Sequence, residues 1–182
     1  MYGDLLLQQN LSFVLPKWHV LLPAAFLVVA VGVINAFFSA TAKARLIFLR
    51  WEHPLPGSRA FSELAKTDTR IDLDKLRATV GVFPKAPARQ NSVWYSLYKS
   101  IENDPAVSQV HKSYLLTRDY AVFAALFIPI LGGLSFVQFP TSTMALSYTG
   151  FLIVQFVLVV RAARTHGYRF VTTVLARKSA ES

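Results

Sequence analysis

Three long runs without a charged side chain constrain this chain more than any other feature of its sequence. Residues 20–40, 120–139 and 144–160 contain no Asp, Glu, Lys or Arg over 21, 20 and 17 residues. Because a helix rises 1.5 Å per residue, about 20 apolar residues cross a hydrocarbon core of roughly 30 Å. The uncharged residues 140–143 join the second and third runs and lengthen the third.

We therefore predict an all-α integral membrane protein with three transmembrane helices and a short-helical cytoplasmic segment between the first and the second. The predicted parts are an extracytoplasmic amphipathic N-terminus (1–19), helices at 20–41, 119–139 and 144–160, a cytoplasmic segment (42–118), an outer hairpin turn (140–143) and a basic cytoplasmic tail (161–182). Composition agrees, because 53% hydrophobic and 16% charged residues are too apolar for a typical soluble domain.

The N-terminal residues give two further expectations. A positively charged start is missing, and Asp4 lies where a cleavable signal peptide would have one, so we expect the first run to be a permanent helix. Leu5 to Leu15 are amphipathic and are expected to lie in the outer membrane interface, with Trp18 as an anchor.

The distribution of Lys and Arg predicts the orientation. Basic residues flank one end of every run, namely Lys43, Arg45, Arg50, Lys112, Arg118, Arg161, Arg164 and Arg169, whereas the connection at 140–143 has none. By the positive-inside rule, the N-terminus is outside and residues 42–118 and 161–182 are in the cytoplasm, at the inner membrane if the source is bacterial.

The net charge of +9 favours an anionic partner. Basic residues beside membrane spans are attracted to anionic lipid, so we expect lipid contact and no nucleic acid. The candidates for anion or headgroup contact are Arg45, Arg50, Arg59, Arg118, Arg161 and Arg164.

The cytoplasmic segment is expected to form short helices between turns. The first span should continue inward to Arg50, and the prolines of residues 51–58 should stop it. Gly57 or Ser58 can begin a short helix through Ala65, and Asp72 can cap another that ends at Gly81.

Two later helices are also expected in this segment. After a linker at 83–89, Asn91 should open a helix, and Asp104-Pro105 should start another that runs into the second span and bends at Pro129. Trp94, Tyr95 and Tyr98 form an aromatic stripe, which we expect to pack internally; the alternative is a ligand or partner surface.

Polar and small residues in the runs suggest how the spans pack. Gly32, Ala36, Ala40 and Ala44 recur every four residues and would form a small face, either an intramolecular seam or an oligomer interface. Asn35 and Gln155 each lie five residues before an inner end, so we expect their amides to pair; the alternative is a polar pathway.

The sequence assigns no catalytic residue, cofactor or metal site. It has no cysteine, and none of its histidines (His19, His53, His111 and His166) has a partner at metal-ligand spacing. If the protein is an enzyme, Glu52, His53 and Asp72 are its candidates, beside Arg59, for a site that takes a phosphate headgroup. We favour the alternative that the charged residues form ion pairs, which hold the cytoplasmic helices against the transmembrane helices.

The leading hypothesis is a small non-enzymatic membrane protein that self-associates or joins a membrane complex and uses its cytoplasmic helices as a docking or sensing surface. One alternative is a signal-triggered effector that oligomerises and perturbs the membrane. The other is an enzyme that acts on a lipid or phosphorylated substrate at the inner surface, which requires Glu52, His53, Arg59 and Asp72 to converge on one cleft.

Overall fold

The computed structural model describes residues 26, 29–30, 32–33 and 35–181. The chain divides into two units, Met1–Phe37 and Phe38–Ser182, and each is described by itself. In the first unit the described residues are helical. The predicted interfacial stretch with Trp18 and the start of the first span lie outside the described residues.

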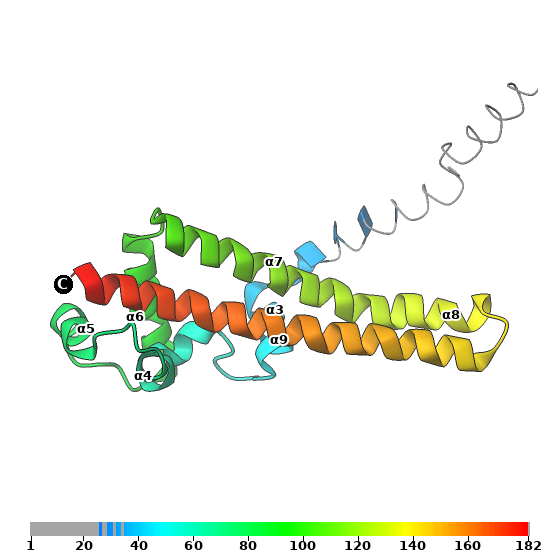
Figure 1. Cartoon of the computed structure of the whole chain (residues 1–182), viewed down its shortest axis with the longest axis horizontal. Coiled ribbons are helices and arrows are strands. Elements are labelled where there is room, and N and C mark those ends of the chain that lie inside the picture. Colours follow the sequence, from blue (N-terminus) through cyan, green and yellow to red (C-terminus); the bar gives the residue numbers. More distant parts are fainter. Residues whose placement is uncertain (1–25, 27–28, 31, 34, 182) are drawn as a thin grey trace, which may run out of the picture. The chain divides into compact units, whose positions relative to one another are not determined.

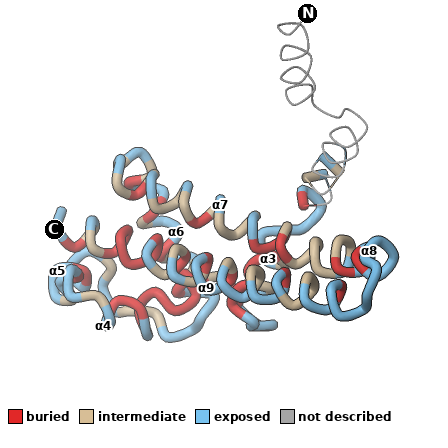
Figure 2. The backbone as a smooth tube through the Cα atoms, turned by 45° about the vertical axis from the view of Figure 1, so that its right-hand side comes forward, coloured by how far each residue is buried: buried red, intermediate tan, exposed pale blue. Residues whose placement is uncertain are grey.

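A helical hairpin forms the frame of the second unit. Its first arm runs from Pro105 to Gln138 and consists of α7 (Pro105–Phe127), a π-helical turn η3 (Ile128–Gly132) and α8 (Gly133–Gln138); its second arm is α9 (Ser142–Glu181). The arms lie side by side and antiparallel in Figures 1 and 2. Both arms are long and apolar enough to cross a membrane.

The first arm confirms the predicted continuous rod. Asp104 caps it by accepting hydrogen bonds from the backbone N–H groups of Ala106 (2.8 Å) and Val107 (3.1 Å). The π-helical turn contains Pro129, because a proline inside a helix removes one hydrogen bond and clashes with the preceding turn.

The second arm is longer than the predicted third span. α9 continues without a break past Val160 to Glu181, so the residues predicted as a basic tail are its second half. This second half contains nine of the twelve buried residues of α9. Figure 2 shows the buried backbone gathered where the small helices cover α9.

The expectation that the first span continues unbroken to Arg50 is wrong. The helix is interrupted at Phe38 and Ser39, and the Ser39 hydroxyl accepts from the backbone N–H of Ala42 (3.1 Å) to cap a separate helix, α3 (Ala40–Phe48). Helix α3 ends at Leu49, which has a left-handed backbone with φ 51°. Among the described residues, two helical arms are long and apolar enough to cross a membrane, and three predicted spans are not shown.

The interruption also divides the predicted small face. Gly32 and Ala36 precede it, whereas Ala40 and Ala44 belong to α3. Ala44 is fully buried in the core of the second unit, and Ala40 is exposed. The four small residues therefore belong to two units, and the face predicted for them stays a prediction.

Short helices follow α3 and cover the second half of α9 (Figure 1). They are η1 (Pro56–Arg59), η2 (Ala60–Leu64), α4 (Ala65–Thr67), α5 (Leu73–Val80) and α6 (Pro87–Ser100). The predicted helix between Asp72 and Gly81 is confirmed. The predicted start at Asn91 is wrong: α6 begins four residues earlier, at Pro87, because proline is already suited to the first helical position.

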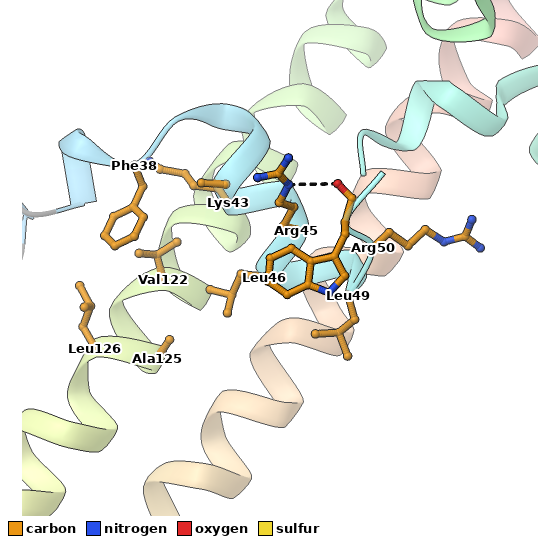
Figure 3. Close-up of a pocket in the computed structure, with 11 residues that line it drawn as sticks. Phe38, Lys43, Arg45, Leu46, Leu49, Arg50, Val122, Ala125 and Leu126 are labelled. Atoms are coloured by element: carbon orange, nitrogen blue, oxygen red, sulfur yellow. Dashed lines mark hydrogen bonds between the residues drawn. The ribbon is translucent and has the colours of Figure 1, made fainter. Parts of the chain in front are cut away.

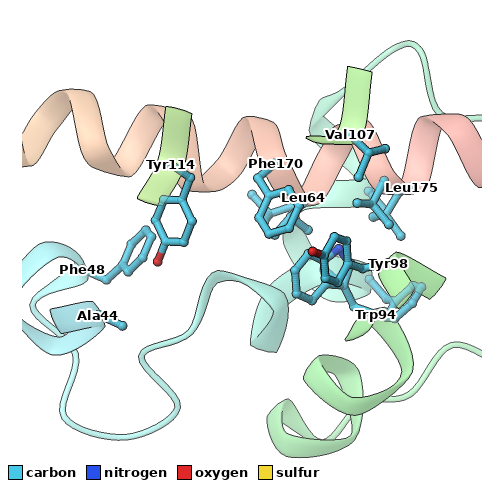
Figure 4. Close-up of a cluster of buried hydrophobic side chains, with 14 of the residues drawn as sticks. Ala44, Phe48, Leu64, Trp94, Tyr98, Val107, Tyr114, Phe170 and Leu175 are labelled. Atoms are coloured by element: carbon cyan, nitrogen blue, oxygen red, sulfur yellow. The ribbon is translucent and has the colours of Figure 1, made fainter. Parts of the chain in front are cut away.

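An aromatic cluster around Phe170 of α9 joins these elements (Figure 4). The Phe170 ring lies 5.1 Å from the rings of both Trp94 and Tyr98 and 4.7 Å from that of His111. Aromatic pairs at such distances contribute about 0.5–1.5 kcal/mol beyond their area burial. Helices α6, α7 and α9 are therefore held together by one set of rings.

Candidate functional site

A groove between α3 and α7 is an apolar hollow lined by both a membrane-length helix and basic residues (Figure 3). Its volume is about 500 Å³, within the range typical of small-molecule sites. Leu46 of α3 and Val122, Ala125 and Leu126 of α7 form its floor, and Lys43, Arg45, Arg50 and Trp51 lie around it.

The end of α3 shapes one wall of this groove. The left-handed conformation of Leu49 turns the chain, and Arg45 Nε then donates to the Trp51 carbonyl oxygen (3.1 Å). Leu49 is 71% exposed and Trp51 is 81% exposed. A positive φ at a non-glycine residue costs of order 1 kcal/mol in backbone conformational energy. The turn that exposes these two apolar side chains is therefore strained at Leu49.

One ion pair joins α3 to α7, and a second lies within α7. Lys43 Nζ lies 3.0 Å from Asp119 Oδ1, and Arg118 Nε lies 3.0 Å from the same oxygen. The Lys43 side chain is only 8% exposed. Lys43 is therefore held inside the protein by Asp119, and because Lys43 and Arg118 share one carboxylate, the three residues together keep a net charge of +1.

Asp119→Asn is expected to lower the free energy of unfolding by about 1–2 kcal/mol. Removing one partner of a fully buried pair costs about 3–5 kcal/mol, and here the carboxylate is partly exposed, so the cost is smaller. Chemical denaturation in nanodiscs measures the change. Asp74→Asn, which removes an exposed pair with Arg77, is the control and should have little effect. Equal effects of the two variants would contradict a structural role for Asp119.

Three of the predicted anion-contact residues already have protein partners. Arg59 is buried between the rings of Phe48 and Tyr168, at 5.8 and 5.4 Å, and lies 3.6 Å from Glu63. Arg164 Nε donates to the backbone oxygen of Ile47, and Arg118 pairs with Asp119 as described.

The other three are exposed: Arg45, Arg50 and Arg161. No carboxylate lies within ion-pair distance of any of them in the described part of the chain. Arg45 and Arg50 lie at the groove.

The aromatic stripe is mostly internal. Trp94 and Tyr98 are 6% and 8% exposed, whereas Tyr95 is 50% exposed. A smaller hollow of about 240 Å³ lies beside them, also lined by His111, Arg118 and Phe170. Of the three predicted residues, Tyr95 alone presents a substantial surface to a partner.

His111 belongs to this cluster. Its Nδ1 lies 3.1 Å from the Tyr98 hydroxyl. Burial raises the pKa of Tyr98 and lowers the pKa of His111, which nearby Arg118 lowers further. At neutral pH the tyrosine hydroxyl is therefore protonated and the imidazole uncharged, and the imidazole tautomer decides which of the two groups donates the hydrogen bond.

We expect the protein to lose stability as the pH falls below about 6.5. The unfolded chain binds a proton at His111 near pH 6.5, whereas the folded state binds it only at lower pH, so protonation favours unfolding. Melting temperatures measured from pH 8 down to pH 5.5 test this. His111→Gln should reduce the pH dependence, and His53→Gln, at an exposed position, should not. An unchanged pH dependence in His111→Gln would contradict the assignment.

Two of the catalytic candidates, Arg59 and Asp72, contact different parts of α9. Arg59 contacts Tyr168, whereas the backbone N–H of Asp72 donates to the Ser179 hydroxyl, 11 residues further along α9 or about 16 Å. Glu52 and His53 are exposed in the connection after α3. The Asp72 carboxylate is already used as the cap of α5, where it accepts from the backbone N–H of residues 74 and 75.

The two amides predicted to pair lie in different units. The Gln155 side chain donates to the Tyr120 hydroxyl (2.5 Å), so it already has a partner across the hairpin. Asn35 belongs to the first unit, and its pairing with Gln155 stays a prediction.

Sequence reasoning missed two polar groups that hold the second unit together. One is the pair of Lys43 with Asp119; the signal was the single acidic residue directly before the second apolar run. The other is Gln90, which is 1% exposed and is hydrogen-bonded through both its Oε1 and its Nε2 atoms. Nothing in its sequence surroundings distinguishes Gln90 from a surface glutamine.

Among the described residues no group of three His, Asp or Glu side chains is arranged to hold a metal ion. Comparisons of the sequence and structure with protein-family models, curated proteins and solved structures found no match. The geometry of the groove and the packing of the helices therefore carry the functional argument.

Proposed function

We propose that this chain is a non-enzymatic integral membrane protein that self-associates or serves as a subunit of a membrane complex. In this proposal the outer part of the hairpin anchors the protein, and the helices packed on the second half of α9 form a docking module in the cytoplasm. The orientation rests on the positive-inside distribution of Lys and Arg.

The observation that carries the proposal is the exposure of large apolar side chains on the outer part of the hairpin. Phe136 and Val137 of α8 are 52% and 80% exposed, and Phe151, Val154 and Leu158 of α9 are 64%, 58% and 63% exposed. Apolar patches of this extent are rare on soluble monomers and mark membrane or protein contacts. No charged residue interrupts them between residues 120 and 160.

Two measurements test the proposal. An integral protein stays with the membrane pellet in alkaline carbonate, whereas recovery in the soluble fraction would contradict the anchor. The native mass of the nanodisc-extracted protein should then exceed that of one chain of 20.3 kDa, through either further copies or a stoichiometric foreign subunit. A strictly monomeric species without partners would contradict the assembly role.

A further inference from the structure

The groove between α3 and α7 has an apolar surface and a positively charged surface. A neutral ligand would match the first surface only. The floor of the groove is aliphatic, formed by Leu46, Val122 and Leu126. Arg45 and Arg50 at its edge are exposed and have no carboxylate partner in the described part of the chain, while Lys43 is paired with Asp119. A ligand that fits both surfaces needs a hydrocarbon part and an anionic part.

The groove lies where the charged part of α7 ends and its uncharged part begins. Arg118 and Asp119 are the last charged residues before the uncharged run of residues 120–139, and the floor residue Val122 follows them within one helical turn. Trp51, which favours the headgroup level of a membrane, lies at the same edge of the groove. A phosphate at headgroup depth would therefore lie beside the two arginines, and an acyl chain of the same lipid would extend along the floor of the groove.

We propose that this groove binds an anionic phospholipid, with its phosphate beside Arg45 and Arg50 and an acyl chain on Leu46, Val122 and Leu126. The inference rests on the proposed membrane anchor. The exposure of Leu49 and Trp51 beside the arginines is unfavourable in water and is relieved by a lipid. The uncharged residues 20–37 of this chain are the competing occupant, and they offer no anion to the arginines.

Native mass spectrometry of the full chain in detergent, titrated with dioleoyl phosphatidylglycerol or dioleoyl phosphatidylcholine, tests the proposal. We expect the anionic lipid to bind about 30-fold more tightly, from the attraction of two cations near a lipid phosphate. In the double variant Arg45→Gln with Arg50→Gln this preference should fall to near one. The matched control, Arg161→Gln with Arg169→Gln, removes two exposed cations from α9 and should keep the preference.

A steric variant tests the acyl-chain contact separately. Ala125→Trp fills the floor of the groove without changing charge, and it should weaken the binding of both lipids. Equal affinity of the wild type for the two lipids, or an equal loss of preference in the control double variant, would overturn the site. So would unchanged lipid binding in Ala125→Trp.

The failure of the lipid site is distinguishable from failure of the anchor. A protein that resists carbonate extraction but shows no lipid preference overturns the site alone. A protein released by carbonate overturns the anchor, and the lipid site with it.

Discussion

Gln90→Leu is expected to weaken the contact between α6 and η2. The free energy of local unfolding at this contact should fall by about 3 kcal/mol. The Gln90 Oε1 atom accepts from the backbone N–H groups of Phe61 (3.1 Å) and Ser62 (3.0 Å), and its Nε2 donates to the Lys85 carbonyl (3.1 Å). Leucine occupies a similar volume but leaves these groups without a partner. Each unsatisfied buried group costs about 1–3 kcal/mol.

Hydrogen exchange of the full chain in nanodiscs measures this loss locally. Amides of residues 60–64 should exchange about 100-fold faster in Gln90→Leu, since 1.4 kcal/mol corresponds to a factor of ten. Gln109→Ala is the matched control, because Gln109 is exposed on α7, and it should leave these amides unchanged. Equal protection of residues 60–64 in Gln90→Leu and the wild type would show that other contacts hold η2 in place.

The features that were predictable from sequence depend on short stretches of chain. Asp72 and Asp104 each accept backbone hydrogen bonds from residues two and three positions later. An Asp directly before a helical pattern predicts such a cap from the sequence alone. The length of an uncharged run likewise needs no tertiary information. For these reasons the start of α7 was predicted correctly, and two of the three uncharged runs mark the two membrane-length arms.

The features that were missed depend on residues far apart in the sequence. Gln90 contacts Phe61 and Ser62 across 29 and 28 positions, and Lys43 contacts Asp119 across 76. The break before α3 was missed for a different reason. Ser39 lies in an apolar run whose composition favours a continuous helix, yet its hydroxyl caps the helix that follows.

The candidate site was partly predictable for the same reasons. Composition indicated six arginines for anion contact, but only tertiary structure separates Arg45 and Arg50 at the groove from Arg59, which is enclosed by Phe48 and Tyr168. Burial of an arginine between rings replaces its solvation by cation–π contacts. A count of charged residues in the sequence does not reveal which arginine is buried in this way.

Gly57→Ala is expected to destabilise the second unit by about 3 kcal/mol. A Cβ atom at Gly57 would lie 2.6 Å from both Asn91 Oδ1 and Trp94 Cε3. The Trp94 ring has little freedom to move, because it stacks on Tyr98 at 5.9 Å and meets the edge of Phe170 at 5.1 Å. Overpacking of a well-packed core costs about 1–3 kcal/mol, and a contact with two groups of α6 lies at the upper end of that range.

Fluorescence-monitored urea unfolding measures this effect when Trp94 is the single tryptophan, in a background of Trp18→Phe and Trp51→Phe. Gly150→Ala is the control: its Cβ would meet open space within α9, so the higher helix propensity of alanine should give no loss of stability. The two glycine variants should therefore differ in sign. If Gly57→Ala were as stable as the wild type, η1 would have room to move away from α6, and the close approach of these two elements would not be required for the fold.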